Sequence, residues 1–370
     1  MGIAATRQSF RQTSQLDRPV KILIVKTSAI GDVIHTLPAL NCLRKHYPDA
    51  RIDWLVEEAA SEAVLGHRAV NQVLVSGRKR WIQLFRQGRW AESWRGFISL
   101  IRQLRATEYD LVIDFQGLLK SGLFVALARG KRKAGFGKGM DHSEASWLFL
   151  NERVQPVDMD QHALTRELLL LAGLGLPCDR IVFDFPIDDK DKAEANALLK
   201  ETGLDLTRPL VVINSMTTWP TKHWINERFA QVADRLQALG MNVIFTGGPK
   251  DVADIETICV AMNGRGINMA GRTSLKVLAA LYERTSLVVT IDSGPMHLAA
   301  AMDTPVVALF GPTAPWRTGP FGAEHTVLRM ELACSPCLKR TCRYNHECMD
   351  QLTVDQVVQA AEKVLNVHGS

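Results

Sequence analysis

The sequence predicts two doubly wound α/β domains, and three observations support this fold class. Short apolar runs rich in β-branched residues alternate with segments whose apolar residues recur at helical spacing. Polar or glycine-containing loops follow most of these runs, as they do where a parallel strand leads into a helix. The third observation is that 370 residues exceed the size of one compact core.

A change of composition near the middle of the chain marks the expected domain boundary. Glycine and proline are frequent in residues 173–177, and residues 188–192 are strongly polar. The first 18 residues are polar and lack the apolar centre of a secretion signal. The predicted parts are a disordered tail at 1–18, an N-terminal domain at 19–185, a C-terminal domain at 186–352 and a C-terminal helix at 353–370.

The N-terminal domain begins with a strand, a polar loop and a helix. Residues 20–25 are a buried-strand pattern, KTSAIGD follows at 26–32, and residues 33–46 have helical spacing. Asp32 therefore lies near a helix start, where a carboxylate often does no more than stabilise the helix dipole. Further strands are predicted at 51–56, 73–75 and 111–115, and a further helix at 162–172.

Lysine and arginine are concentrated in two stretches of the N-terminal half. Residues 78–105 hold eight of them and one acid, Glu92, with tryptophan and phenylalanine interleaved. A basic helix of this kind suits the surface of an anionic membrane, and the alternative is a solvated helix whose aromatic side chains pack on the domain. Residues 129–138 are basic without any acid. The two stretches together favour an acceptor that carries carboxylates or phosphates.

The C-terminal domain repeats the pattern of strand, loop and helix. Strands are predicted at 210–213, 242–246, 267–269, 287–291 and 306–310, and helices at 227–239, 274–282 and 296–302. The run 287–291 ends on Asp292-Ser293-Gly294, and Pro295 stands at the expected helix start. The unpaired N–H groups of such a terminus attract phosphate, so this stretch is a candidate phosphate site. The alternative interpretation is an ordinary turn between strand and helix with a capping serine. Since ligands bind at the carboxyl ends of parallel strands, we expect the site in a cleft between the domains.

Composition excludes some classes of protein and leaves the cysteines open. Apolar residues make up 46% and charged residues 22%, and the net charge of +5 is too small to indicate nucleic acid. The odd count of seven cysteines predicts reduced thiols in the cytosol. Four cysteines lie close in sequence with His346 among them, which is enough for a structural zinc or iron–sulfur site, and the alternative is free or disulfide-prone thiols. These four are Cys334, Cys337, Cys342 and Cys348.

Several motifs together resemble the bacterial heptosyltransferases of glycosyltransferase family 9. KTSAIGDVIHTLPAL at 26–40 and DSGPMHLAAAMDTPVVALFGPT at 292–313 carry most of the resemblance, and TTWPTKHW, RIDWLVEE and DFQGLLKS strengthen it. The first run and RIDWLVEE are similar to heptosyltransferase I. The cysteine-rich end and AGRTSL are similar to heptosyltransferase II, so the acceptor stays open between the two.

The resemblance implies a GT-B fold, in which two Rossmann-like domains face each other across a cleft. It implies inverting transfer of heptose from ADP-L-glycero-D-manno-heptose to the Kdo/heptose inner core of lipopolysaccharide, with lipid A-Kdo as acceptor and without a cofactor. It also implies a cytoplasmic protein, peripheral to the inner membrane. The implied site residues are Asp32 as general base and Lys222 at the phosphates; Thr217, Thr218, Asp251, Asp292, Ser293, Gly294 and His297 on the donor; and Lys79, Arg80 and Arg166 on the acceptor.

Two other functions are compatible with the same fold. One is a GT-B transferase that uses another sugar nucleotide for a surface polysaccharide. The other is a protein that binds a nucleotide sugar without catalysis. The presence of Asp32, Lys222, Asp292 and His297 argues against a decayed site. A protein that only binds the nucleotide sugar would also have no need of a carboxylate opposite the phosphate site.

Overall fold

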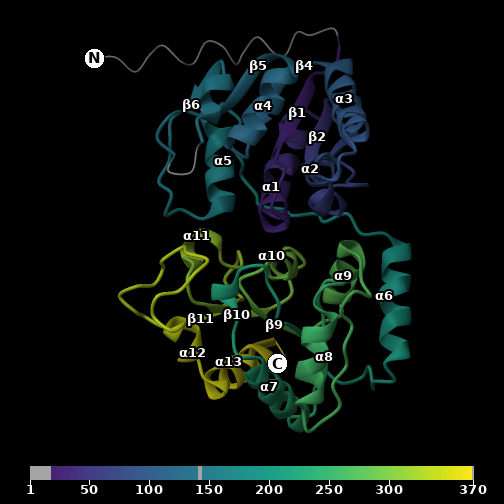
Figure 1. Ribbon diagram of the computed structural model, residues 1–370, viewed down its shortest axis with the longest axis vertical. Coiled ribbons are helices and arrows are strands. Elements are labelled where there is room, and N and C mark those ends of the chain that lie inside the picture. Colours follow the sequence, from purple (N-terminus) through teal and green to yellow (C-terminus); the bar gives the residue numbers. More distant parts are fainter. Residues whose placement is uncertain (1–17, 141–143, 369–370) are drawn as a thin grey trace. The chain divides into compact units, whose positions relative to one another are not determined.

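The computed structural model describes residues 18–140 and 144–368 (Figure 1). The chain divides into two compact units, Met1–Asp184 and Phe185–Ser370, each built on its own parallel sheet. The predicted tail at residues 1–18 lies, except for residue 18, outside the described residues. Among the described helices, none combines the length and apolar character needed to cross a bilayer.

The sheet of unit 1 contains six parallel strands in the order β3-β2-β1-β4-β5-β6. The strands are β1 (Lys21–Val25), β2 (Arg51–Glu57), β3 (Gln72–Ser76), β4 (Glu108–Asp114), β5 (Arg129–Phe136) and β6 (Glu152–Val154). The chain proceeds outward from β1 to β3 and then crosses back to β4 on the other side of β1. The loops after β1 and β4 therefore lie at the topological switch point, where doubly wound sheets bind ligands.

Helices cover the sheet of unit 1 because the strands are apolar on both faces. Ile22, Leu23 and Ile24 in β1 are fully buried, and α5 packs against α1. The helices are α1 (Ile30–His46), α2 (Arg78–Arg86), α3 (Trp90–Ala106), α4 (Leu119–Leu127) and α5 (Ala163–Gly173), with 3₁₀ turns at Glu58–Ala63 and Ser146–Phe149.

The two basic stretches differ from the sequence prediction. The first is two helices, α2 and α3, because Gly88 adopts a left-handed backbone (φ 77°) and the chain turns back there. The second, which we did not predict as a strand, is mostly β5. Three of its five cations pair with acids of the adjacent strands, so much of the positive charge of this stretch is neutralised locally. The N···O distances are 3.5 Å for Arg129–Glu108, 3.6 Å for Lys131–Asp110 and 2.7 Å for Arg132–Glu152.

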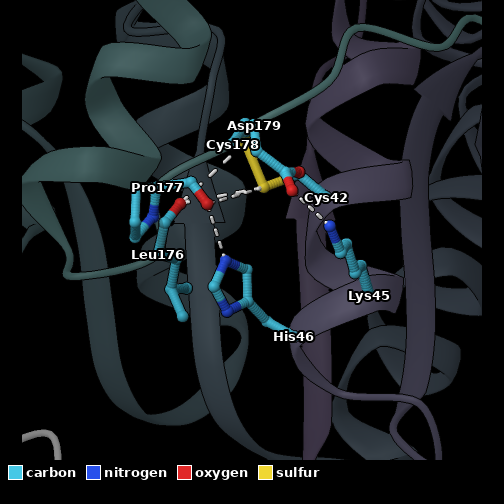
Figure 2. The surroundings of a disulfide bond; sticks show 7 residues. All are labelled: Cys42, Lys45, His46, Leu176, Pro177, Cys178 and Asp179. Carbon is cyan, nitrogen blue, oxygen red and sulfur yellow. Dashed lines mark hydrogen bonds and ion pairs between the residues drawn. A yellow bond between two sulfur atoms is a disulfide. The ribbon is translucent and has the colours of Figure 1, made fainter.

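The prediction that all cysteines are reduced is wrong for one pair. Cys42 on α1 and Cys178, just after α5, form a disulfide with their Cα atoms 5.7 Å apart (Figure 2). The packing of α5 on α1 brings these two residues together although 136 positions separate them. An ion pair between Lys45 and Asp179 (2.5 Å) joins the same two segments.

Unit 2 contains five parallel strands in the order β11-β10-β9-β7-β8. The strands are β7 (Leu210–Asn214), β8 (Asn242–Phe245), β9 (Leu287–Ile291), β10 (Val306–Phe310) and β11 (Thr326–Arg329). The predicted strand at 267–269 is wrong, because this segment makes only an isolated bridge from Asn268 to Phe245. The switch point of this sheet lies between β7 and β9.

The helices of unit 2 pack on both faces of this sheet and bury its core. Alternate residues such as Val211, Ile213 and Val289 belong to one apolar cluster with α7, α8 and α13, and α13 packs against α7. The helices are α6 (Asp189–Glu201), α7 (Asn226–Ala238), α8 (Val252–Val260), α9 (Leu275–Tyr282), α10 (Gly294–Ala301), α11 (Pro315–Thr318), α12 (Glu347–Asp350) and α13 (Val354–His368), with a 3₁₀ turn at Pro220–Lys222.

The disulfide predicts the number of thiols that a chromogenic thiol reagent will detect. Denatured protein kept in its oxidised state should show five thiols, because Cys42 and Cys178 are bonded and the other cysteines are free. After reduction the count should rise to seven. Seven thiols before reduction would contradict the disulfide.

Asp114 makes the stability of unit 1 depend on pH. Its buried carboxylate ends β4 and accepts hydrogen bonds from the Gln116 N–H (3.0 Å), the Gly117 N–H (3.1 Å) and the Ser121 hydroxyl (3.1 Å). Burial raises the pKa of Asp114 to about 6, although these hydrogen bonds oppose the rise. Between about pH 4 and pH 6, the folded state therefore binds more protons at this carboxyl than the unfolded state does. The contribution of Asp114 to the free energy of unfolding is complete below about pH 4 and is lost as the pH rises through about 6.

The substitution Asp114→Asn should remove this pH dependence, since the amide stays neutral. It can still accept from both N–H groups and can donate to the Ser121 oxygen. We expect the urea midpoint of the variant to exceed that of the parent by more at pH 8 than at pH 5. Equal differences at the two pH values would contradict the raised pKa.

Candidate functional site

Gln116 links the two loops at the switch point of unit 1. Its side-chain oxygen accepts hydrogen bonds from the Thr27 and Ser28 N–H groups, each at 2.9 Å. One amide side chain after β4 therefore fixes the backbone of the loop after β1. The sequence placed DFQGLLKS in this region, but nothing in its spacing identified the glutamine as the link.

Lys26 and Glu167 form a buried ion pair behind this loop. The Lys26 ammonium lies 2.6 Å from a Glu167 carboxylate oxygen and donates to the Phe115 carbonyl at 3.1 Å. Burial lowers the pKa of Lys26, but the attraction of Glu167 and Asp32 outweighs it, so the net shift is upward. Lys26 therefore stays charged, and its field acts on Asp32.

Asp32 caps the helix in which it lies. Its half-buried carboxylate accepts a hydrogen bond from the Ala29 N–H at 2.8 Å, near the start of α1. The helix-stabilising role that we considered for this residue is thus real. A carboxylate has further lone pairs, so this bond leaves room for a catalytic role. The assignment of Asp32 as general base stays a prediction.

A second charged network beside the same loop was missed in the sequence. Glu57, at the end of β2, is buried and accepts from Arg78 at 3.0 Å and from Lys120 at 3.3 Å. The Lys120 ammonium also donates to the Ser28 hydroxyl at 2.6 Å. These residues lie up to 92 positions apart, so only the fold brings them together.

The three residues predicted to bind the acceptor lie on two elements of unit 1. Lys79 and Arg80 are exposed in the first turn of α2, which follows the edge strand β3. Arg166 lies half-buried on α5, where its charge acts on Lys26. Their role with an acceptor stays a prediction.

In unit 2, the carboxylate of Asp292 joins the loops that follow three neighbouring strands. One of its oxygens lies 2.7 Å from the Lys222 ammonium and accepts a hydrogen bond from the Thr313 hydroxyl at 2.6 Å. Lys222 comes after β7, Asp292 after β9 and Thr313 after β10. The structure thus brings together two predicted residues, and Thr313, the last residue of the 292–313 motif and not among the predicted site residues, is the third member.

Ser293, Gly294 and His297 lie at the start of α10. Ser293 precedes the helix with an extended backbone, and its hydroxyl lies 3.3 Å from the Thr290 hydroxyl and 3.5 Å from the Asn214 side-chain oxygen. Gly294 is the first helical residue, and His297 is buried in the first turn. The expected helix terminus beside the Asp292 carboxylate is therefore present, and it offers N–H groups and a positive dipole end.

The remaining predicted donor residues lie on the loops after β7 and β8. His223 hydrogen-bonds to the Thr217 carbonyl at 2.8 Å, which shapes the loop, while Thr218 is exposed. Asp251 precedes α8 and accepts a hydrogen bond from the Gly248 N–H at 2.7 Å. The structure thus gives Asp251 a role in a turn, and its contact with a ribose stays a prediction.

The sequence left a structural metal at the four cysteines as one possibility. In the part of the chain that the structure describes, no group of three or more His, Cys, Asp or Glu is arranged to hold a metal ion. The four cysteines of this region have free thiols. Burial, together with the other three thiols, raises the pKa of Cys348 to about 11.

Two parallel α/β units, each with polar loops at its switch point, are the architecture of GT-B glycosyltransferases, and solved structures of glycosyltransferases match this chain. The family model "Glycosyltransferase family 9 (heptosyltransferase)" matches residues 97–347. The chain therefore belongs to glycosyltransferase family 9.

Curated relatives extend this match over most of the chain. Lipopolysaccharide heptosyltransferase 1 of Pseudomonas aeruginosa is 35% identical over 327 residues, which cover 88% of each chain. Its namesake in Escherichia coli is 31% identical and covers 84% of this chain and 93% of its own. Lipopolysaccharide core heptosyltransferase OpsX of Haemophilus influenzae is 28% identical, and the match covers 82% of this chain and 83% of that protein.

Two solved structures share the fold. The family 9 glycosyl transferase of Veillonella parvula has a TM-score of 0.76 and 26% identity, and the match covers 95% of this chain and 98% of that one. The E. coli heptosyltransferase WaaC with ADP-2-deoxy-2-fluoro heptose has a TM-score of 0.73 and 28% identity, and the match covers 93% of this chain and 99% of that one.

The buried Lys26–Glu167 pair leads to a prediction for stability. The substitution Lys26→Met leaves a buried carboxylate without its cation and should cost about 3–5 kcal/mol in the free energy of unfolding. Adding Glu167→Leu should recover most of this loss, because the buried charge is then removed as well. Urea unfolding of the two variants tests this, and a double variant as unstable as the single one would contradict it.

Proposed function

We propose that this protein transfers L-glycero-D-manno-heptose from ADP-heptose to the Kdo part of Kdo₂-lipid A, before any heptose has been added, which is the reaction of a heptosyltransferase I. The cluster of Asp292, Lys222 and Thr313 beside the N-terminus of α10 carries the proposal, because it combines a cation, hydroxyls and N–H groups. The names of the more similar curated relatives support the addition of the first heptose rather than the second. These relatives are named heptosyltransferase 1 at 31–35% identity, against 25% for a heptosyltransferase 2 of Salmonella typhimurium.

On the donor side, the loops of unit 2 hold the diphosphate and stabilise the charge of the departing ADP. Lys222 and the Thr217 and Thr218 hydroxyls act on the phosphate oxygens, and the N–H groups at the start of α10 face the same anion. Asp292 keeps the Lys222 ammonium in place through the 2.7 Å ion pair. His297 contacts the sugar or diphosphate, and Asp251 contacts the ribose.

On the acceptor side, Asp32 removes the proton from the attacking hydroxyl of the acceptor. The Asp32 carboxylate accepts a hydrogen bond from the Ala29 N–H at 2.8 Å, and the Lys26 ammonium lies close enough to act on it electrostatically. Attack of the hydroxyl on the anomeric carbon in a single displacement then inverts this centre. Lys79, Arg80 and Arg166 bind the carboxylates and phosphates of the acceptor.

Because the proposed acceptor carries a lipid, we infer that the protein works at the cytoplasmic face of the inner membrane. Three large aromatic side chains of α2 and α3 are strongly exposed, with fractions of 61% for Phe85, 64% for Trp90 and 63% for Trp94. They lie among the eight basic residues of 78–105. Aromatic side chains among cations suit peripheral contact with anionic headgroups.

Asp32→Asn tests the general base without removing the helix cap, because the amide oxygen can still accept from the Ala29 N–H. We expect kcat to fall about 10²- to 10⁴-fold, while ADP binding and thermal unfolding stay close to the parent. ADP release from ADP-heptose in the presence of Kdo₂-lipid A measures the rate. A variant with near-normal kcat would remove Asp32 from this role.

Lys222→Ala tests the phosphate contact. Losing one charge-assisted contact should weaken ADP binding by about tenfold or more in calorimetry. Lys200→Ala, at an exposed position on α6, is the control and should bind ADP like the parent. Equal affinity of the two variants would argue against the donor site at Lys222.

The choice of substrates separates this proposal from the other two functions. Release of ADP with Kdo₂-lipid A, and little with the mono-heptosylated product, supports the first-heptose reaction. Turnover only with another sugar nucleotide would support a different transferase, and ADP binding without turnover would support a binding protein.

A further inference from the structure

The cysteine-rich segment, residues 334–348, packs against the loops that carry the donor cluster. The Ser335 hydroxyl donates to the Gly311 carbonyl at 2.6 Å, and the Leu338 N–H donates to the Pro312 carbonyl at 2.8 Å. On the other side, the Thr221 hydroxyl donates to the Lys339 carbonyl at 2.7 Å. The segment therefore bonds to the loop that holds Thr313 and to the turn that holds Lys222.

These bonds position Arg340 beside the ring of Trp219. The Arg340 guanidinium carbon lies over this ring, 4.9 Å from its centroid. The Lys222 ammonium lies 4.6 Å from the same centroid. Two cations from segments about 120 positions apart in sequence thus share one aromatic ring, and one of them is the lysine proposed to contact phosphate.

The net charge of the Lys222–Asp292 pair favours a second cation at the donor site. The ion pair between Lys222 and Asp292 cancels one positive charge against one negative charge at 2.7 Å. A nucleoside diphosphate brings at least two negative charges, which this pair does not balance. Arg340 is an exposed cation, and its guanidinium contacts the Trp219 ring.

The chemistry of a guanidinium suits this place. A guanidinium over an aromatic ring uses its face for the ring, so the N–H donors at its edge remain available to an anion. Arginine also binds phosphate oxygens in a two-pronged geometry that lysine does not offer. Trp219 thus acts as a platform that orients the donors of Arg340.

We propose that Arg340 binds the diphosphate of the sugar-nucleotide donor, and that the cysteine-rich segment presents it there. This inference rests on the proposed function, because it adds a residue to the same donor site. It also gives a role to a segment for which the sequence offered only a metal or free thiols.

Calorimetry with ADP and AMP on the full-length protein tests the assignment. Arg340→Ala should weaken ADP binding about 10- to 100-fold, as expected for a charge-assisted contact, and should change AMP binding much less. Arg340→Lys keeps the charge but loses the paired donors, so its affinity for ADP should lie between the parent and the alanine variant. Arg343→Ala, an exposed arginine in the same segment, is the matched control and should bind ADP like the parent.

Each other outcome overturns the inference in a recognisable way. Normal ADP binding by Arg340→Ala would remove Arg340 from the donor site and leave the proposed function standing. Equal losses for ADP and AMP, or a lowered unfolding temperature, would show that Arg340 only supports the fold of the loop. If the parent protein binds no ADP, the proposed function fails and the inference fails with it.

Discussion

The carboxylate of Asp292 is the interaction on which the candidate donor site depends. It is buried at the end of β9, and it binds Lys222 from the loop after β7 and Thr313 from the loop after β10. A buried charge is stable only when it is paired and hydrogen-bonded, so this carboxylate must hold both partners. The strand order β10-β9-β7 makes such an arrangement possible, because it places the three loops side by side.

Unit 1 uses a buried charge in a similar way, with the signs reversed. Lys26 follows β1 and is held by Glu167 on α5 and by the Phe115 carbonyl after β4. In each unit, therefore, one ion at the switch point connects loops that are distant in sequence. Parallel sheets favour this solution, since their strand ends leave backbone and side-chain polar groups at a single edge.

The sequence predicted the parts of each site that are local. Strand, loop and helix follow one another within a few residues at Asp32 and at Asp292, and both were located from this pattern. The link through Gln116, the network around Glu57 and the bond from Thr313 were not predicted, because each joins residues that only the fold brings together.

Strand β5 and the division of the first basic stretch were also missed in the sequence, because each depends on contacts made only in the folded unit. β5 is an interior strand with four cations, three of which pair with acids in β4 and β6 that no local pattern reveals. The single basic helix expected at 78–105 is divided at Gly88, where a left-handed backbone turns the chain so that α2 packs against α3. Charge pairing and chain reversal are thus properties of the folded unit and not of a window of sequence.

The bond between Cys42 and Cys178 encloses β2 to β6 and the helices between them in one covalent ring. A single proteolytic cut inside this ring opens the chain without releasing a fragment. Material nicked there keeps its full mass on a denaturing gel until a reductant is added, so integrity checks that omit reduction will overlook damage in most of unit 1.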